Sequence, residues 1–175
     1  AGLGSGTQLN MAVAEGVCRI TGVSLPADLL AAKIAARGLR SAVGLHGYFL
    51  GGCIYERATS DMVAAEPNVD DTQYGINPVR CRMNFPVEWH VALLRPSGTP
   101  TIKIAGQAEQ QRFRQLNRPA ASVRKALAGM VERTMLPAIE ALDFSAFCES
   151  VHRYNRRSGE FFAAVQGGQY NGPAI

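Results

Sequence analysis

The sequence predicts an α+β fold, in which helices and strands are mixed without regular alternation. Apolar residues recur at helical spacing near the start of the chain and again in its last third, whereas the middle holds short apolar runs of strand character. Because these runs are not separated by regularly placed helices, a doubly wound parallel sheet is disfavoured. With 47% hydrophobic residues, the 175-residue chain has enough apolar side chains for a folded core.

The first part of the chain predicts two helices. Gln8–Thr21 carries an apolar stripe, and Gly22 suits the left-handed position that follows a helix. A second helix is expected to run to Arg37, with Ser24 as its N-cap and Pro26 in its first turn.

The residues that follow predict a loop and a set of short strands. Gly38–Gly47 is punctuated by glycines and is expected to be a loop, and Tyr48–Glu56 a buried strand interrupted by two glycines. Residues 57–86 are polar and rich in proline, with one short strand around Val79–Phe85. Two more strands are expected at Trp89–Leu94 and Thr101–Ile104.

The last third predicts three helices and a domain boundary before them. The helices are Gln107–Leu116, Ala120–Leu142, which Pro137 bends or divides, and Phe144–Arg157 with Asp143 as its N-cap and a break at Ser158-Gly159. The composition changes near Phe85-Pro86, so residues 1–86 and 87–175 are expected to form parts of two domains.

Charge and cysteine content exclude several classes of protein. The net charge is +4, and all basic residues except Lys33, Lys103 and Lys125 are arginines, which suit phosphate and carboxylate. The arginines form no dense run with aromatics, so nucleic acid is not an expected partner. No apolar run reaches the roughly 18 residues of a membrane span. Four widely spaced cysteines without a CxxC pair favour buried thiols in a reducing cytosol over zinc or disulfides.

The first eight residues predict a phosphate-binding loop. The sequence Gly2-Leu3-Gly4-Ser5-Gly6-Thr7-Gln8 runs directly into the first predicted helix. Glycines let the backbone approach an anion, and the first N–H groups of a helix are unpaired and carry partial positive charge. Gly2, Gly4, Ser5, Gly6 and Thr7 are therefore candidate phosphate ligands, although Ser5 could also act only as a helix N-cap.

Other candidate residues lie in later glycine-rich segments. Arg40 could bind an anion or be a solvated arginine, and His46 could contact substrate or be structural. Ser41 is a candidate substrate contact. Gln166, Gly167 and Gly168 could bring backbone close to a ligand or form only a turn.

Three of these segments together resemble one family. The glycine loop is similar to the phosphate-binding motif of the galactokinase, homoserine kinase, mevalonate kinase and phosphomevalonate kinase superfamily, with Gly6-Thr7 in place of the usual Ser-Ala. Arg40 stands where these kinases have the Asp that acts as base, and arginine cannot accept a proton. With the segments 40–47 and 165–170, the chain most resembles the β-ribofuranosylaminobenzene 5′-phosphate synthase branch, which serves methanopterin biosynthesis and hence one-carbon metabolism.

The resemblance implies a glycosyltransferase that joins phosphoribosyl pyrophosphate to 4-aminobenzoate or 4-hydroxybenzoate, with loss of CO2 and pyrophosphate. It implies a small-molecule-kinase-like fold, Mg2+ on the pyrophosphate, a cytoplasmic location and a possible homodimer, with Arg40 and His46 as catalytic residues. It also implies that the chain is an internal fragment, inactive by itself. The alternatives are an ATP-dependent small-molecule kinase of the same superfamily and a ligand-binding relative without catalysis.

Overall fold

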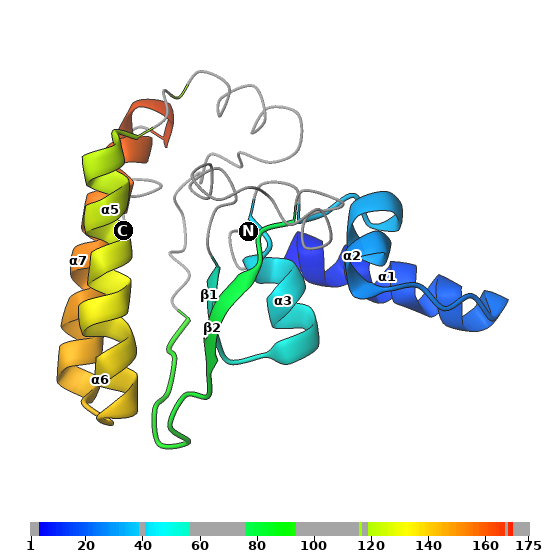
Figure 1. Ribbon diagram of the computed structural model, residues 1–175, viewed down its shortest axis with the longest axis horizontal. Coiled ribbons are helices and arrows are strands. Elements are labelled where there is room, and N and C mark those ends of the chain that lie inside the picture. The colour runs from blue at the N-terminus through cyan, green and yellow to red at the C-terminus, as the bar shows by residue number, and fades with distance from the viewer. Residues whose placement is uncertain are drawn as a thin grey trace, which may run out of the picture. The chain divides into compact units, whose positions relative to one another are not determined.

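A computed structural model describes residues 4–38, 41–56, 76–93, 116, 119–166 and 168–169. The chain divides into two compact units, Ala1–Phe85 and Pro86–Ile175. The described part is mostly helical with one small two-stranded antiparallel sheet, which is consistent with the predicted α+β class (Figure 1). The assignment of the units to two partial domains of a longer protein stays a prediction.

The first predicted helix of unit 1 is confirmed and begins three residues earlier than expected. Helix α1 spans Ser5–Thr21, with Gly4 as its N-cap residue. Gly22 follows it in the left-handed conformation with φ 70°. The N–H of Val23 donates to the Cys18 carbonyl at 2.9 Å, so the carbonyls at the helix end are satisfied as the sequence indicates.

The second predicted helix is present but differs at both ends. It comprises α2 (Ala27–Leu29) and the π-helical segment η1 (Leu30–Ile34). Pro26 occupies the N-cap position and no side chain caps the helix, so the prediction of Ser24 as N-cap is wrong. The helix ends before Arg37, because Ala36 takes a left-handed conformation with φ 52°.

The predicted loop and strand over residues 38–56 need correction. Val43–Leu50 forms helix α3, so the loop ends at Ala42 and only the last four residues of the expected strand, Cys53–Glu56, form strand β1. A short apolar run does not distinguish a buried strand from a buried helix. Helix packing decides here: Leu45 is 2% exposed against the core, and Arg82 donates to the Leu50 and Gly51 carbonyls at the helix end.

The expected strand near Val79 is confirmed. Strand β2 (Val79–Met83) pairs antiparallel with β1, and Cys53 lies opposite Met83. The register shifts between Tyr55 and Glu56. Such an irregularity changes the direction in which a side chain points. It affects Glu56, whose carboxylate accepts a hydrogen bond at the start of α3.

The core of unit 1 lies where α1, η1 and α3 meet. Met11 on α1 is fully buried, and Leu45 contributes from α3. The buried cluster consists of Met11, Ala14, Leu30, Ala31, Ala35, Ala42, Leu45 and Ile76. The small alanines let the three helices approach closely, so the segments that the sequence singled out are held against one another.

Unit 2 contains a helical hairpin. Its first arm runs through α5 (Ala121–Met130), the π-helical η3 (Val131–Met135) and α6 (Leu136–Glu140). Pro137 lies in the first turn of α6, directly after η3, so the predicted helix is divided into segments near this residue. Proline has no N–H to donate to the carbonyl four residues earlier, and its ring clashes with that carbonyl. The wider π-helical turn of η3 accommodates the missing hydrogen bond and the ring.

The second arm is longer than the sequence predicts. Helix α7 spans Phe144–Gln166 and packs along the first arm (Figure 1). Asp143 accepts from the Ala146 N–H at 2.9 Å, which confirms it as the N-cap. The predicted break at Ser158-Gly159 is wrong. Gly159 is buried within the helix, and a Cβ there would overlap the Gln169 carbonyl, so this glycine serves close packing.

Two further expectations concern residues 89–116. Trp89–Leu93 forms no strand, so that prediction is wrong for the described residues. The Trp89 ring instead lies 5.3 Å from Phe144 and 5.0 Å from Phe147 between centroids, and this contact with α7 replaces strand pairing. The predicted strand Thr101–Ile104 and nearly all of the helix Gln107–Leu116 lie outside the described residues.

Cysteine exposure differs from the expectation of buried thiols. Cys18, Cys53 and Cys81 are half-buried and Cys148 is exposed, and all four are free. Burial raises the pKa of the Cys53 thiol, as does the neighbouring Cys81. No helix within the described ranges has the length and apolar character to cross a membrane.

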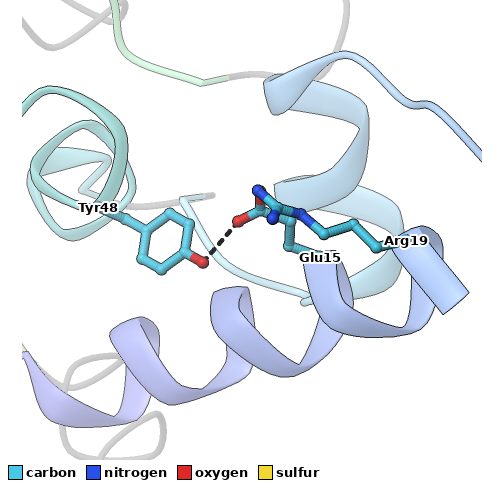
Figure 2. A network of polar contacts seen from close by, with 3 residues as sticks. All are labelled: Glu15, Arg19 and Tyr48. Atoms are coloured by element: carbon cyan, nitrogen blue, oxygen red, sulfur yellow. Dashed lines mark hydrogen bonds and ion pairs between the residues drawn. The ribbon is translucent and has the colours of Figure 1, made fainter.

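A polar network ties α1 to α3. The Tyr48 hydroxyl donates to Glu15 Oε2 at 2.6 Å, and Arg19 Nη2 contacts Glu15 Oε1 at 2.6 Å (Figure 2). The hydrogen bond from Tyr48, followed by that from Arg19, holds the pKa of Glu15 below its ordinary value. The same bond raises the pKa of Tyr48.

We expect Tyr48→Phe to raise the pKa of Glu15 toward its ordinary value, measured by NMR titration of the side-chain carboxyl. Because the pKa of Glu15 is lower in the folded protein than in the unfolded chain, ionised Glu15 stabilises the fold at pH values above its unfolded-state pKa. This stabilisation is lost as the pH falls through the folded-state pKa of Glu15. The stability difference between the native protein and the variant should therefore shrink on acidification. Tyr154→Phe in unit 2 is the control, and an unchanged Glu15 pKa in Tyr48→Phe would contradict the role of this bond.

Candidate anion-binding site

The start of α1 has the local structure of an anion site. Gly4 has φ 68°, and its carbonyl accepts from the Thr7 and Gln8 N–H groups at 3.0 and 3.1 Å. Among the described residues, nothing accepts from the N–H groups of Ser5 and Gly6, which come first in the helix. Gly4, Ser5 and Gly6 are exposed, and a Cβ at Gly4 would meet no atom within 4 Å. The positive end of the helix is thus open to a ligand.

The structure brings the second glycine-rich segment against this loop. A Cβ built at Gly44, in the first turn of α3, would lie 3.1 Å from Thr7 Cγ2. Gln8 Nε2 donates to the Gly44 carbonyl at 2.8 Å. Thr7 therefore packs on α3, so that its side chain fixes the loop. Only a residue without a side chain at position 44 permits this approach.

Arg37 lies beside the same helix start and was missed by sequence reasoning. Its backbone N–H donates to the Ala31 carbonyl at 2.8 Å, which fixes the turn after η1. A Cβ at Gly6 would lie 3.9 Å from Arg37 Nη2. The Asn10 amide is oriented so that both its oxygen and its nitrogen have hydrogen-bond partners. Its Oδ1 accepts from Arg37 Nη2 and Nε at 2.9 and 3.0 Å, and its Nδ2 donates to the Gly6 carbonyl at 3.3 Å.

The clamp by Asn10 gives this guanidinium a defined place and leaves other donors for a ligand. Arg37 has five N–H donors, of which Asn10 uses one on Nη2 and the one on Nε. The side chain is exposed, so an anion can reach it. The sequence around Arg37 did not mark it as a site residue, because its proximity to Gly6 depends on the packing of η1 against α1. The amide of Asn10 at helical spacing from Gly6 was the one local hint.

A second network holds the start of α3 from the other side. Glu56 Oε2 accepts from the Ala42 N–H at 2.6 Å, and Asn77 Nδ2 donates to Glu56 Oε1 at 3.3 Å. His46 Nε2 lies 2.8 Å from the Asn77 carbonyl oxygen, which makes this nitrogen the donor. Of the two interpretations of His46, this contact favours a structural one, and its catalytic role stays a prediction. Sequence reasoning missed Glu56 and Asn77, which act here by positioning.

The remaining predicted residues are placed only in part. Gly2, Arg40 and Gly167 lie outside the described residues. Ser41 is exposed and directly precedes Ala42, the N-cap residue of α3. Gln166 ends α7, and the Gly168 N–H donates to the Ala163 carbonyl at 3.2 Å. These two belong to unit 2, whereas the loop belongs to unit 1.

The site offers donors for an anion and few ligands for a metal ion. Within the described ranges, no three His, Cys, Asp or Glu side chains gather in a group that could hold a metal. Mg2+ generally keeps several waters and binds through substrate phosphates. The arrangement of helix start and arginine can therefore bind a phosphate or pyrophosphate.

A comparison with curated proteins finds a relative from an archaeon. The chain is 32% identical over 157 residues to β-ribofuranosylphenol 5′-phosphate synthase of Methanothermobacter thermautotrophicus. The match covers 86% of this chain and 45% of the relative, so the chain spans less than half the length of that enzyme. No family model and no solved structure matches the chain. The expected resemblance is confirmed: the chain is a homologue of part of a β-ribofuranosylphenol 5′-phosphate synthase.

Proposed function

We propose that the protein containing this chain is a synthase of this type, which transfers the phosphoribosyl group of phosphoribosyl pyrophosphate to 4-hydroxybenzoate or 4-aminobenzoate in methanopterin biosynthesis. The observation that carries the proposal is the 32% identity to the named synthase over 86% of the chain. The open start of α1 beside Arg37 supports it, because the donor substrate carries phosphate groups. The proposal includes the small-molecule-kinase-like fold, Mg2+ as a helper and a homodimer.

The proposed reaction makes a carbon–carbon bond. The bond from ribose C1 to the pyrophosphate oxygen breaks, and pyrophosphate keeps the electron pair. The ring carbon that bears the carboxylate attacks C1, and loss of CO2 returns an electron pair to the ring and restores its aromaticity. Charge grows on the leaving pyrophosphate, so donors aimed at it lower the barrier. The N–H groups of Ser5 and Gly6, with the guanidinium of Arg37, are proposed for that role.

The test is a labelled-substrate assay with the full protein that contains this chain. Carboxyl-labelled 4-hydroxybenzoate or 4-aminobenzoate should release labelled CO2 only when phosphoribosyl pyrophosphate is present. The matched control replaces phosphoribosyl pyrophosphate with ribose 5-phosphate, which lacks the leaving group. Labelled CO2 with the pyrophosphate donor alone supports the synthase. ATP-dependent phosphorylation of a small molecule would contradict the synthase and indicate a kinase. Binding of phosphoribosyl pyrophosphate without turnover would contradict it as well and indicate a ligand-binding relative.

A further inference from the structure

A cavity of about 620 Å³ lies between the two arms of the helical hairpin in unit 2. Its apolar wall is formed by Val123, Met130 and Phe161. Its basic wall is one face of α7, where Arg153, Arg156 and Arg157 stand at helical spacing. The volume falls in the usual range for small-molecule sites, and apolar walls with a few converging polar groups are typical of them.

The basic wall holds more positive charge than its surroundings neutralise. Arg153 Nη1 is 4.0 Å from Glu149, a long and exposed ion pair that contributes little. Within the described ranges, neither Arg156 nor Arg157 has an acceptor or ion-pair partner. Among the described residues that line the cavity, Glu160 is the single carboxylate, and it accepts from Gln169 Nε2 at 3.3 Å. Arg153 lies three and four residues before Arg156 and Arg157, so the like charges on this face repel one another unless an anion lies among them.

The opposite arm adds to this positive field. Pro119 and Ala120, which line the cavity, directly precede α5. The first turn of α5 has no acidic residue and no side-chain cap. Its N-terminal end therefore carries uncompensated partial positive charge on the same side as the arginines. Arginines and helix end together favour a ligand with more than one negative charge, whereas Phe161 and Met130 favour one with an apolar body.

We propose that this cavity binds a small organic phosphomonoester. A phosphomonoester dianion matches three arginines opposed by one carboxylate better than a monocarboxylate does, since a single negative charge leaves the arginines under-neutralised. The apolar wall takes the ester group, which inorganic phosphate lacks. The lining residues that the structure describes belong to unit 2, and none of them belongs to the anion site at the start of α1. The inference does not depend on the synthase chemistry, because its test measures binding without turnover.

The test is calorimetric titration of the full protein with phenyl phosphate, benzoate and inorganic phosphate, in an Arg37→Ala background that weakens the unit 1 site. Phenyl phosphate should bind saturably and more weakly as salt rises. Arg156→Gln with Arg157→Gln should weaken it at least tenfold, since charge-assisted contacts are lost. Val123→Thr should weaken phenyl phosphate but leave inorganic phosphate unchanged, because it makes only the apolar wall polar.

The matched control is Lys125→Gln with Arg133→Gln, which removes the same charge from exposed residues of the first arm that do not line the cavity. It should leave phenyl phosphate binding within about twofold, with the folding of both double variants checked by circular dichroism. If the control double variant weakens phenyl phosphate binding as much as the Arg156→Gln, Arg157→Gln variant does, the effect is due to net charge alone and the proposal is overturned. Benzoate or inorganic phosphate binding as tightly as phenyl phosphate, or no saturable binding, would overturn it too.

Discussion

Replacing Gly44 by valine is expected to push α3 away from α1 and to disable the anion site. A Cβ at position 44 would already lie 3.1 and 3.2 Å from Thr7 Cγ2 and Cβ, and valine adds two methyl groups beyond it. Overpacking of this kind costs roughly 1–3 kcal/mol. It also displaces the Gly44 carbonyl from Gln8 Nε2. We expect a lower free energy of unfolding in urea, together with weaker binding of phosphoribosyl pyrophosphate by the full protein.

Gly47→Val is the matched control, because the same change is made in the same helix where a Cβ would meet no atom within 4 Å. Valine has a slightly better helix propensity than glycine, so this variant should be about as stable as the native protein. If the two valine variants unfold at the same urea concentration and bind the ligand equally, the close approach of Thr7 and Gly44 does not hold the site together.

Arg37→Ala is expected to reduce the affinity for phosphoribosyl pyrophosphate by roughly 10- to 150-fold, the equivalent of ~1.5–3 kcal/mol for a lost charge-assisted contact. Arg37→Lys should recover part of the loss, because lysine keeps the charge but not the planar fork that Asn10 holds. Arg133→Ala, an exposed arginine of unit 2, is the control for charge alone. If Arg37→Ala binds phosphoribosyl pyrophosphate as tightly as the native protein, Arg37 does not contact the ligand.

Arg40→Ala separates the sequence prediction from the structural one. Arg40 lies outside the described residues, and its role as an anion ligand stays a prediction. If both arginines contact the ligand, each alanine variant should lose affinity. A loss in Arg37→Ala alone would assign the anion contact to the residue that the packing of η1 places beside Gly6.

Local signals in the sequence were sufficient for several elements. The helix α1, the left-handed Gly22 and the capping by Asp143 each depend on residues a few positions apart, and the structure confirms them. The apolar residues that predicted α1, Leu9, Val13, Val17 and Ile20, are nevertheless exposed, and its buried residues are Met11 and Ala14. The glycine loop at the start of α1 also followed from local sequence. Every helix begins with unpaired N–H groups, so these could be predicted. The structure was needed to show that the space around Gly4 is open.

Tertiary packing decided what the sequence could not predict. Residues 43–50 form a helix because Leu45 packs into the core with Met11, although the same apolar run suits a strand. Gly159 looked like a helix breaker but is a position where the returning chain lies against α7. Arg37 and Glu56 reach the site only through the turn after η1 and the β1–β2 irregularity, which depend on contacts between distant segments.

A crystal structure of the full protein with phosphoribosyl pyrophosphate tests most directly the claim that the start of α1 is the phosphate site. We predict that the pyrophosphate lies at this helix end, within hydrogen-bond distance of the Ser5 and Gly6 N–H groups and of the Arg37 guanidinium. A pyrophosphate bound away from α1, with these three groups still in contact with solvent, would contradict the account.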